Sequence, residues 1–122
     1  MQLKNLTVLI VEDDPNDVLL IRRAFQKAKI LNPLQFVNDG EQAVQYLSGL
    51  PPFADSEKYP APVLLLLDLK LPKKSGFEVL EWLQQQNTLH RLPVVVLTSS
   101  NQSSDINHAY DLGANSYLVK PV

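Results

Sequence analysis

The sequence predicts an α/β fold, a doubly wound parallel sheet of five strands with helices on its faces. Three observations predict this fold class. Several short apolar runs lack the polar alternation of a half-exposed sheet, and such runs are typical of parallel strands buried on both faces. Segments with apolar residues at helical spacing lie between the runs. The two kinds of segment alternate strictly along the chain, which is the element order of a doubly wound sheet.

The five strands are predicted from the apolar runs. The clearest runs are residues 7–11 (TVLIV), 63–67 (VLLLL) and 94–97 (VVVL). Weaker runs of the same type are residues 34–37 and 117–119. Each run is too short for a helix of ordinary length, which favours the strand interpretation.

Three helices are predicted between the first four strands. The first begins after Asp14, a good N-cap, with Pro15 at the first helical position. The second covers residues 41–47, and the third carries apolar residues at helical spacing from Phe77 onward.

The fourth helix is predicted to begin near Ser103 or Ser104 and to stop at Gly113, a natural residue after a helix end. Residues 49–62 interrupt the pattern before the third strand and contain four of the nine prolines. Because the sheet continues after them, we expect these residues to form a surface loop within the same domain.

Length and composition exclude several classes of protein. The 122 residues carry 11 basic and 13 acidic side chains, and 45% of them are apolar, which predicts one domain over residues 1–122. A net charge of −2 does not favour nucleic acid or an anionic membrane as a partner. The absence of cysteine excludes disulfides, cysteine-based zinc sites and thiol catalysis. With neither a signal peptide nor an apolar run long enough to span a bilayer, we expect a cytoplasmic protein.

Polar side chains that carry chemistry follow the carboxyl ends of the predicted strands, where doubly wound folds bind their ligands. They are Glu12, Asp13, Asp14, Asp68, Thr98 and Lys120. Like charges about 4 Å apart repel by roughly 4 kcal/mol at an effective dielectric constant of about 20, so clustered carboxylates need a cation. Oxygen ligands without histidine or cysteine favour Mg²⁺.

A cation, an ammonium group and a hydroxyl around one carboxylate can stabilise a phosphoryl group in transfer. Lys120 supplies the ammonium group, Thr98 supplies the hydroxyl, and Asp68 is the expected nucleophile. Asp14 has a competing interpretation as the cap of the first helix, which explains it without chemistry.

Four motifs in order, VLIVEDDP, LLLLDLKLPKKSGFEVL, VVVLTSS and GANSYLVKP, resemble the CheY-like receiver domain of two-component response regulators. The resemblance covers almost the whole chain and implies the flavodoxin-like strand order 2-1-3-4-5. The proline-rich loop and the LKLPKKSGFEVL segment look most like stand-alone regulators paired with cyanobacterial phytochromes.

The resemblance assigns a metal site and an acceptor. It implies that Asp68 is the phosphoacceptor and also a metal ligand. It further implies that Asp13 binds Mg²⁺ directly, that Glu12 acts mostly through water, and that Lys70 lends its backbone carbonyl.

The resemblance also assigns a switch. Thr98 and Lys120 match the hydroxyl and lysine that contact the phosphoryl oxygens, and Tyr117 matches the aromatic switch position. The bond between Lys120 and Pro121 is expected to be cis, as at the matching proline of the family.

The resemblance implies a sensor histidine kinase as phosphodonor, of the phytochrome-like kind, and a protein as the downstream partner. The chain would catalyse its own phosphorylation and dephosphorylation as a switch rather than as a turnover enzyme. The family's fifth helix is absent from these residues, so we expect an uncovered fifth strand, which favours association into a homodimer. The resemblance also implies dimer contacts on the face of the fourth helix and fifth strand, with Tyr110, Leu112 and Tyr117 as candidates.

Two other classes remain open. A phosphohydrolase with an aspartyl nucleophile would need a D-x-D motif after the first strand, which Glu12, Asp13 and Asp14 do not provide. A binding module derived from a receiver typically loses the acceptor, the lysine or the hydroxyl, and all three residue types are present here.

Overall fold

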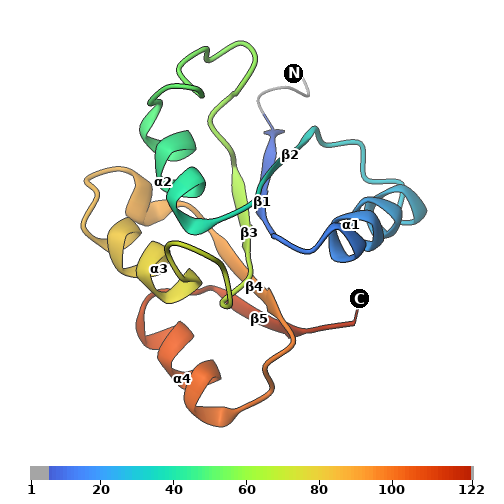
Figure 1. Cartoon of the computed structure of the whole chain (residues 1–122), viewed down its shortest axis with the longest axis vertical. Coiled ribbons are helices and arrows are strands. Elements are labelled where there is room, and N and C mark those ends of the chain that lie inside the picture. Colours follow the sequence, from blue (N-terminus) through green and yellow to red (C-terminus); the bar gives the residue numbers. More distant parts are fainter. Residues whose placement is uncertain (1–5, 122) are drawn as a thin grey trace.

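The computed structural model describes residues 6–121, so Val122 and residues 1–5, which carry part of the signal-peptide argument, lie outside it. Five parallel strands form one sheet in the order β2-β1-β3-β4-β5, which confirms the predicted order (Figure 1). The strands are β1 (Val8–Val11), β2 (Leu34–Val37), β3 (Leu64–Leu67), β4 (Val94–Thr98) and β5 (Ser116–Val119). The helices are α1 (Pro15–Lys27), α2 (Gly40–Ser48), α3 (Gly76–Gln84) and α4 (Ser103–Asp111), with a short 3-10 helix η2 (Leu89–Arg91).

Helices lie on both faces of the sheet, as the continuous apolar runs predict. Figure 1 shows α1 on one side of the sheet and α2, α3 and α4 on the other. Successive side chains of a strand point to opposite faces. In β1, Ile10 therefore packs with Ile21 of α1, while Leu9 and Val11 belong to the larger core beneath α2, α3 and α4.

The helix starts follow the capping signals in the sequence. The Asp14 side chain accepts a hydrogen bond from the Asn16 N–H at 2.9 Å, which confirms its interpretation as the α1 cap. Ser75 and Glu78 form a reciprocal capping box at the start of α3. The fourth helix begins at Ser103 and is followed by Gly113 with φ of +101°, as predicted.

The proline-rich loop folds back onto α2. The rings of Tyr46, Phe53 and Tyr59 lie within 5.1–5.8 Å of one another, centroid to centroid. The Tyr46 hydroxyl donates a hydrogen bond to the Pro60 carbonyl at 2.8 Å. Aromatic packing therefore holds this long surface loop in place.

The uncovered face of β5 differs from the surface expected for dimer contacts. Leu118 is half exposed and borders an apolar hollow of about 240 Å³ on the α1 side, together with Val95 and Leu97. Tyr117 and Leu112 pack against the opposite core, because alternate side chains of a strand point to opposite faces. The role of Tyr110, Leu112 and Tyr117 as dimer contacts stays a prediction.

Among residues 6–121, no helix combines the length and the apolar character needed to cross a membrane.

Candidate functional site

The strand ends bring the predicted site residues to one edge of the sheet. Val11 and Leu67 are register partners in β1 and β3, so the residues that follow them, Glu12 and Asp68, leave the sheet side by side. Thr98 ends β4, and the Lys120 N–H donates to its carbonyl at 2.9 Å. Parallel pairing thus gathers four chain segments at one point, as the sequence predicts.

Three carboxylates form a compact acidic cluster. Glu12, Asp13 and Asp68 each offer an oxygen, and these oxygens lie within 4.8 Å of one another. Glu12 and Asp68 are buried, whereas Asp13 is exposed. An all-oxygen set of this size fits a hard divalent cation, which would relieve the repulsion between the carboxylates.

Lys120 lies at the centre of the site, and its side chain is largely buried. Its ammonium group donates to Glu12 at 2.5 Å, to Asp17 at 2.7 Å and to Asp68 at 3.2 Å. Burial alone would lower the pKa of Lys120, but the hydrogen bonds to Asp17 and Glu12 outweigh it and raise the pKa. Lys120 is therefore a permanent positive charge beside Asp68.

Burial raises the pKa of Glu12 above its ordinary value, against the lowering effect of the hydrogen bond from Lys120. The backbone N–H of Asp14 also donates to the Glu12 carboxylate, at 3.1 Å. Glu12 thus has polar partners on two sides, as a buried carboxylate requires.

Asp17 is a site residue that the sequence reasoning missed. It lies in the first turn of α1 and is partly exposed, with 26% of its side chain accessible. Its contact with Lys120 joins residues 103 positions apart. The available signal was its place in the helix turn that directly follows the acidic run at the end of β1.

Thr98 presents an unusual hydroxyl. The residue is fully buried, and within residues 6–121 its Oγ1 is a buried side-chain atom without a hydrogen-bond partner. Buried polar atoms in native proteins almost always have a partner, so an orphaned hydroxyl at a strand end beside an acidic cluster points to a missing ligand.

Tyr117 is tied to the loop between β4 and α4. Its hydroxyl donates to the Ser100 carbonyl at 2.9 Å, and the Ser100 hydroxyl donates to Asp105 of α4 at 2.6 Å. Burial raises the pKa of Tyr117, so its hydroxyl stays a donor at neutral pH. A chain of hydrogen bonds therefore links β5 to the start of α4.

The remaining predicted features lie beside the acidic cluster. The bond between Lys120 and Pro121 is cis, as expected. The side chain of Lys70 is exposed, and the backbone N–H of Lys70 donates a hydrogen bond to the Asp68 carboxylate at 3.3 Å. The role of the Lys70 carbonyl as a metal ligand stays a prediction.

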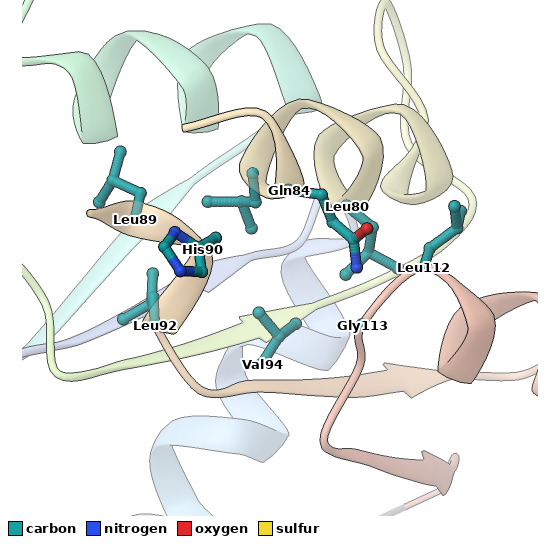
Figure 2. Close-up of a pocket in the computed structure, with 9 residues that line it drawn as sticks. Leu80, Gln84, Leu89, His90, Leu92, Val94, Leu112 and Gly113 are labelled. Carbon is teal, nitrogen blue, oxygen red and sulfur yellow. The ribbon is translucent and has the colours of Figure 1, made fainter. Parts of the chain in front are cut away.

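A separate hollow of about 250 Å³ lies between α3, η2 and the end of α4, at the beginning of β4 (Figure 2). Its walls include Leu80, Leu92, Val94 and Leu112, and no carboxylate lines it. The hollow is at the opposite end of β4 from Thr98 and is distinct from the acidic cluster.

Comparison with known proteins identifies the family. A family model described as the response regulator receiver domain matches residues 8–122. The response regulator Rcp1 of Synechocystis sp. is 40% identical over 113 residues, which cover 93% of this chain and 75% of Rcp1.

Solved structures agree with the sequence match. A response regulator in red light signaling of R. palustris is 41% identical with a TM-score of 0.90, over 96% of this chain and 82% of that chain. The phosphorylated cyanobacterial phytochrome response regulator RcpA is 39% identical with a TM-score of 0.87, over 97% of this chain and 82% of that chain. A crystal structure of Rcp1 in its Mn²⁺-bound form has a TM-score of 0.86, at 39% identity over 95% of this chain and 81% of that chain. The chain therefore belongs to the response regulator receiver domain family, and it is similar to regulators linked to phytochromes.

Proposed function

We propose that this protein accepts a phosphoryl group on Asp68 from a phosphohistidine of a sensor histidine kinase and then switches a protein-binding surface. The observation that carries the proposal is the convergence of Lys120, Glu12 and Asp13 on the buried Asp68 at the strand ends. The orphaned hydroxyl of Thr98 supports it, because a phosphoryl oxygen is the acceptor that this hydroxyl lacks.

The proposed chemistry is an in-line transfer. A carboxylate oxygen of Asp68 bonds to phosphorus as the bond from phosphorus to the kinase histidine nitrogen breaks. The electron pair of the broken bond stays on the imidazole, and the product is an acyl phosphate on Asp68. The buried ammonium group of Lys120 offsets the charge on the phosphoryl oxygens.

The cation fits the same site. Glu12, Asp13 and Asp68 would hold Mg²⁺, with the backbone carbonyl of Lys70 as a further ligand. Bound Mg²⁺ would neutralise negative charge on the phosphoryl oxygens. The Mn²⁺-bound form of Rcp1 supports a divalent cation in a similar protein.

The switch would run from the phosphoryl group to α4. Thr98 would turn its hydroxyl to a phosphoryl oxygen, and Tyr117 would shift with the loop that carries Ser100. Asp105 connects that loop to α4, so the conformation of α4 would depend on the state of Asp68.

The similar proteins support a role in phytochrome-linked signalling. We propose a phytochrome-like histidine kinase as the phosphodonor, because the similar structures include a phytochrome response regulator and a regulator of red light signaling. The output is a contact with another protein. Residues 1–122 would act as one receiver unit that forms a homodimer through the apolar face that contains Leu118.

Incubation with a small phosphodonor and Mg²⁺, followed by intact mass measurement, tests the proposal. Retention of one phosphoryl group per chain is expected. Turnover of the donor without retained mass would instead identify a phosphohydrolase, and no reaction at all would identify a binding module.

A further inference from the structure

We infer that Asp17 is a positioning residue that draws Lys120 away from Asp68 and thereby slows phosphorylation of the acceptor. This inference rests on the proposed function and adds a residue to its site. It starts from the three carboxylates that share one ammonium group.

Lys120 lies closer to Asp17 than to the acceptor Asp68. Its ammonium nitrogen lies 2.7 Å from Asp17 and 3.2 Å from Asp68, so the contact with the acceptor is the longer of the two. An ammonium group has three N–H donors, and Glu12, Asp17 and Asp68 accept one each. Lys120 therefore has no donor left for an incoming phosphoryl oxygen unless it releases a carboxylate.

Asp17 is the carboxylate that Lys120 can release most easily. Glu12 is buried with 2% of its side chain accessible, and breaking its contact would leave a buried charge without its cation. Asp17 has 26% of its side chain accessible, so water can replace the lysine there. Asp17 also stands outside the group of oxygens that could hold a metal ion.

The same carboxylate acts on the phosphoryl group through its charge. A phosphoryl group on Asp68 adds negative charge at a site where Asp17 is already bound to the shared lysine. Asp17 therefore opposes phosphorylation twice, by competing for the ammonium group and by adding negative charge nearby. Removing its charge frees Lys120 for the phosphoryl oxygens.

The test compares initial phosphorylation rates of the parent and of Asp17→Asn, with acetyl phosphate as donor at saturating Mg²⁺. Asparagine keeps the shape of the side chain, and the expected rate increase is about threefold to tenfold, typical of a charge partly screened by solvent. Asp17→Glu, which keeps the charge, should react at close to the parental rate.

Asp14→Asn is the matched control. Asp14 is the N-cap residue just before the helix turn that contains Asp17, and the substitution removes the same charge. Its carboxylate caps α1 without contacting Lys120, so the phosphorylation rate of Asp14→Asn should stay at the parental value. Equilibrium binding of beryllofluoride, a phosphoryl analogue, gives a readout without transfer and should be tighter in Asp17→Asn alone.

Three outcomes would overturn the inference. They are an initial phosphorylation rate of Asp17→Asn at or below that of the parent, an equal rate increase in Asp14→Asn, and an unchanged beryllofluoride affinity of Asp17→Asn. A parent that takes up no phosphoryl group would overturn the proposed function and this inference together, so the two failures are distinguishable. Thermal unfolding of each variant shows whether its fold is intact.

Discussion

At the scale of single residues, the hydroxyl of Thr98 lowers the stability of the unphosphorylated fold, but in the phosphorylated protein it would donate a hydrogen bond to the phosphoryl group. Replacing threonine by isosteric valine removes a buried, unpartnered oxygen. Thr98→Val should therefore raise the free energy of unfolding by about 1 kcal/mol. The same variant should accept phosphate more slowly, because a donor to the phosphoryl oxygens is lost.

Urea denaturation and intact mass measurement check the two effects of Thr98→Val. Thr98→Ser keeps a hydroxyl and serves as the control for phosphorylation. A valine variant that is less stable and reacts at the parental rate would show that Thr98 only fills space.

Some residues of the candidate site could be predicted from the sequence, and others could not. Asp68, Lys120 and Thr98 could be named from the sequence because each ends or follows an apolar run, and parallel strands must share an edge. Asp17 could not, because its contact depends on where the fold places the first turn of α1 relative to Lys120, which is far away in the sequence. The partnerless state of the Thr98 hydroxyl is equally a property of packing rather than of spacing.

At the scale of elements, the loop that contains Lys70 and Lys74 packs closely against Gly40 at the start of α2. A Cβ atom on Gly40 would lie 1.9 Å from the carbonyl oxygen of Lys74 and 2.7 Å from its carbon. The backbone of Lys74 cannot move away from such a Cβ atom as easily as the end of a flexible side chain could. Gly40 therefore allows α2 to approach this loop closely.

Gly40→Ala should push the loop away from α2, lower the free energy of unfolding by about 2 kcal/mol or more and weaken Mg²⁺ binding. Urea denaturation and calorimetric titration with Mg²⁺ measure the two effects. Gly49→Ala is the control, because alanine would be strained at the φ of +68° found there, but its Cβ would meet nothing within 4 Å. Equal Mg²⁺ affinity in the parent and Gly40→Ala would contradict this role of the contact.

The proline-rich loop depends on one buried hydroxyl. Burial, with a smaller contribution from Tyr59, raises the pKa of Tyr46 to about 12 from its ordinary value of 10.0. The unfolded chain loses this proton first as the pH rises, so the stabilising contribution is complete below pH 10 and declines toward pH 12.

Tyr46→Phe should lower the free energy of unfolding by about 1 kcal/mol at neutral pH, since the hydrogen bond to Pro60 is lost. The difference between parent and variant should shrink as the pH rises above 10. Urea denaturation from pH 8 upward measures it. A difference that stays constant or grows through this range would contradict the assignment.

The elements themselves were largely predictable. β2 has the predicted bounds, and β5 begins one residue earlier than predicted, at Ser116. The short helix η2 (Leu89–Arg91) was missed, because three residues are too few to show a period. The packing of the proline-rich loop on α2 could not be predicted from the sequence either, because the hydrogen bond between Tyr46 and Pro60 depends on tertiary packing.

At the scale of the whole molecule, the sheet has one covered face and one that is only partly covered. α1 protects the part around Ile21, whereas Leu118 of β5 remains 50% exposed beside an apolar hollow. An exposed apolar surface of this kind favours association. The proposed homodimer would bury this surface.

Sedimentation at micromolar concentration should show a dimer for the parent and a monomer for Leu118→Glu, because a charge buried in an apolar interface is costly. Leu31→Glu is the control, since Leu31 is more exposed, at 76%, and does not line the hollow. A parent that stays monomeric in both phosphorylation states would contradict the proposed dimer.

The proposed function depends above all on Asp68 as the phosphoacceptor, and mapping the modified residue tests this role. The parent and Asp68→Asn are incubated with acetyl phosphate and Mg²⁺, and borohydride then reduces any acyl phosphate to homoserine before peptide mass spectrometry. Homoserine is expected at position 68 of the parent, and no labelled peptide is expected in the variant. The variant should keep its fold because asparagine is nearly isosteric with aspartate. Label at another residue of the parent, or undiminished labelling of Asp68→Asn, would contradict the role of Asp68 as the phosphoacceptor.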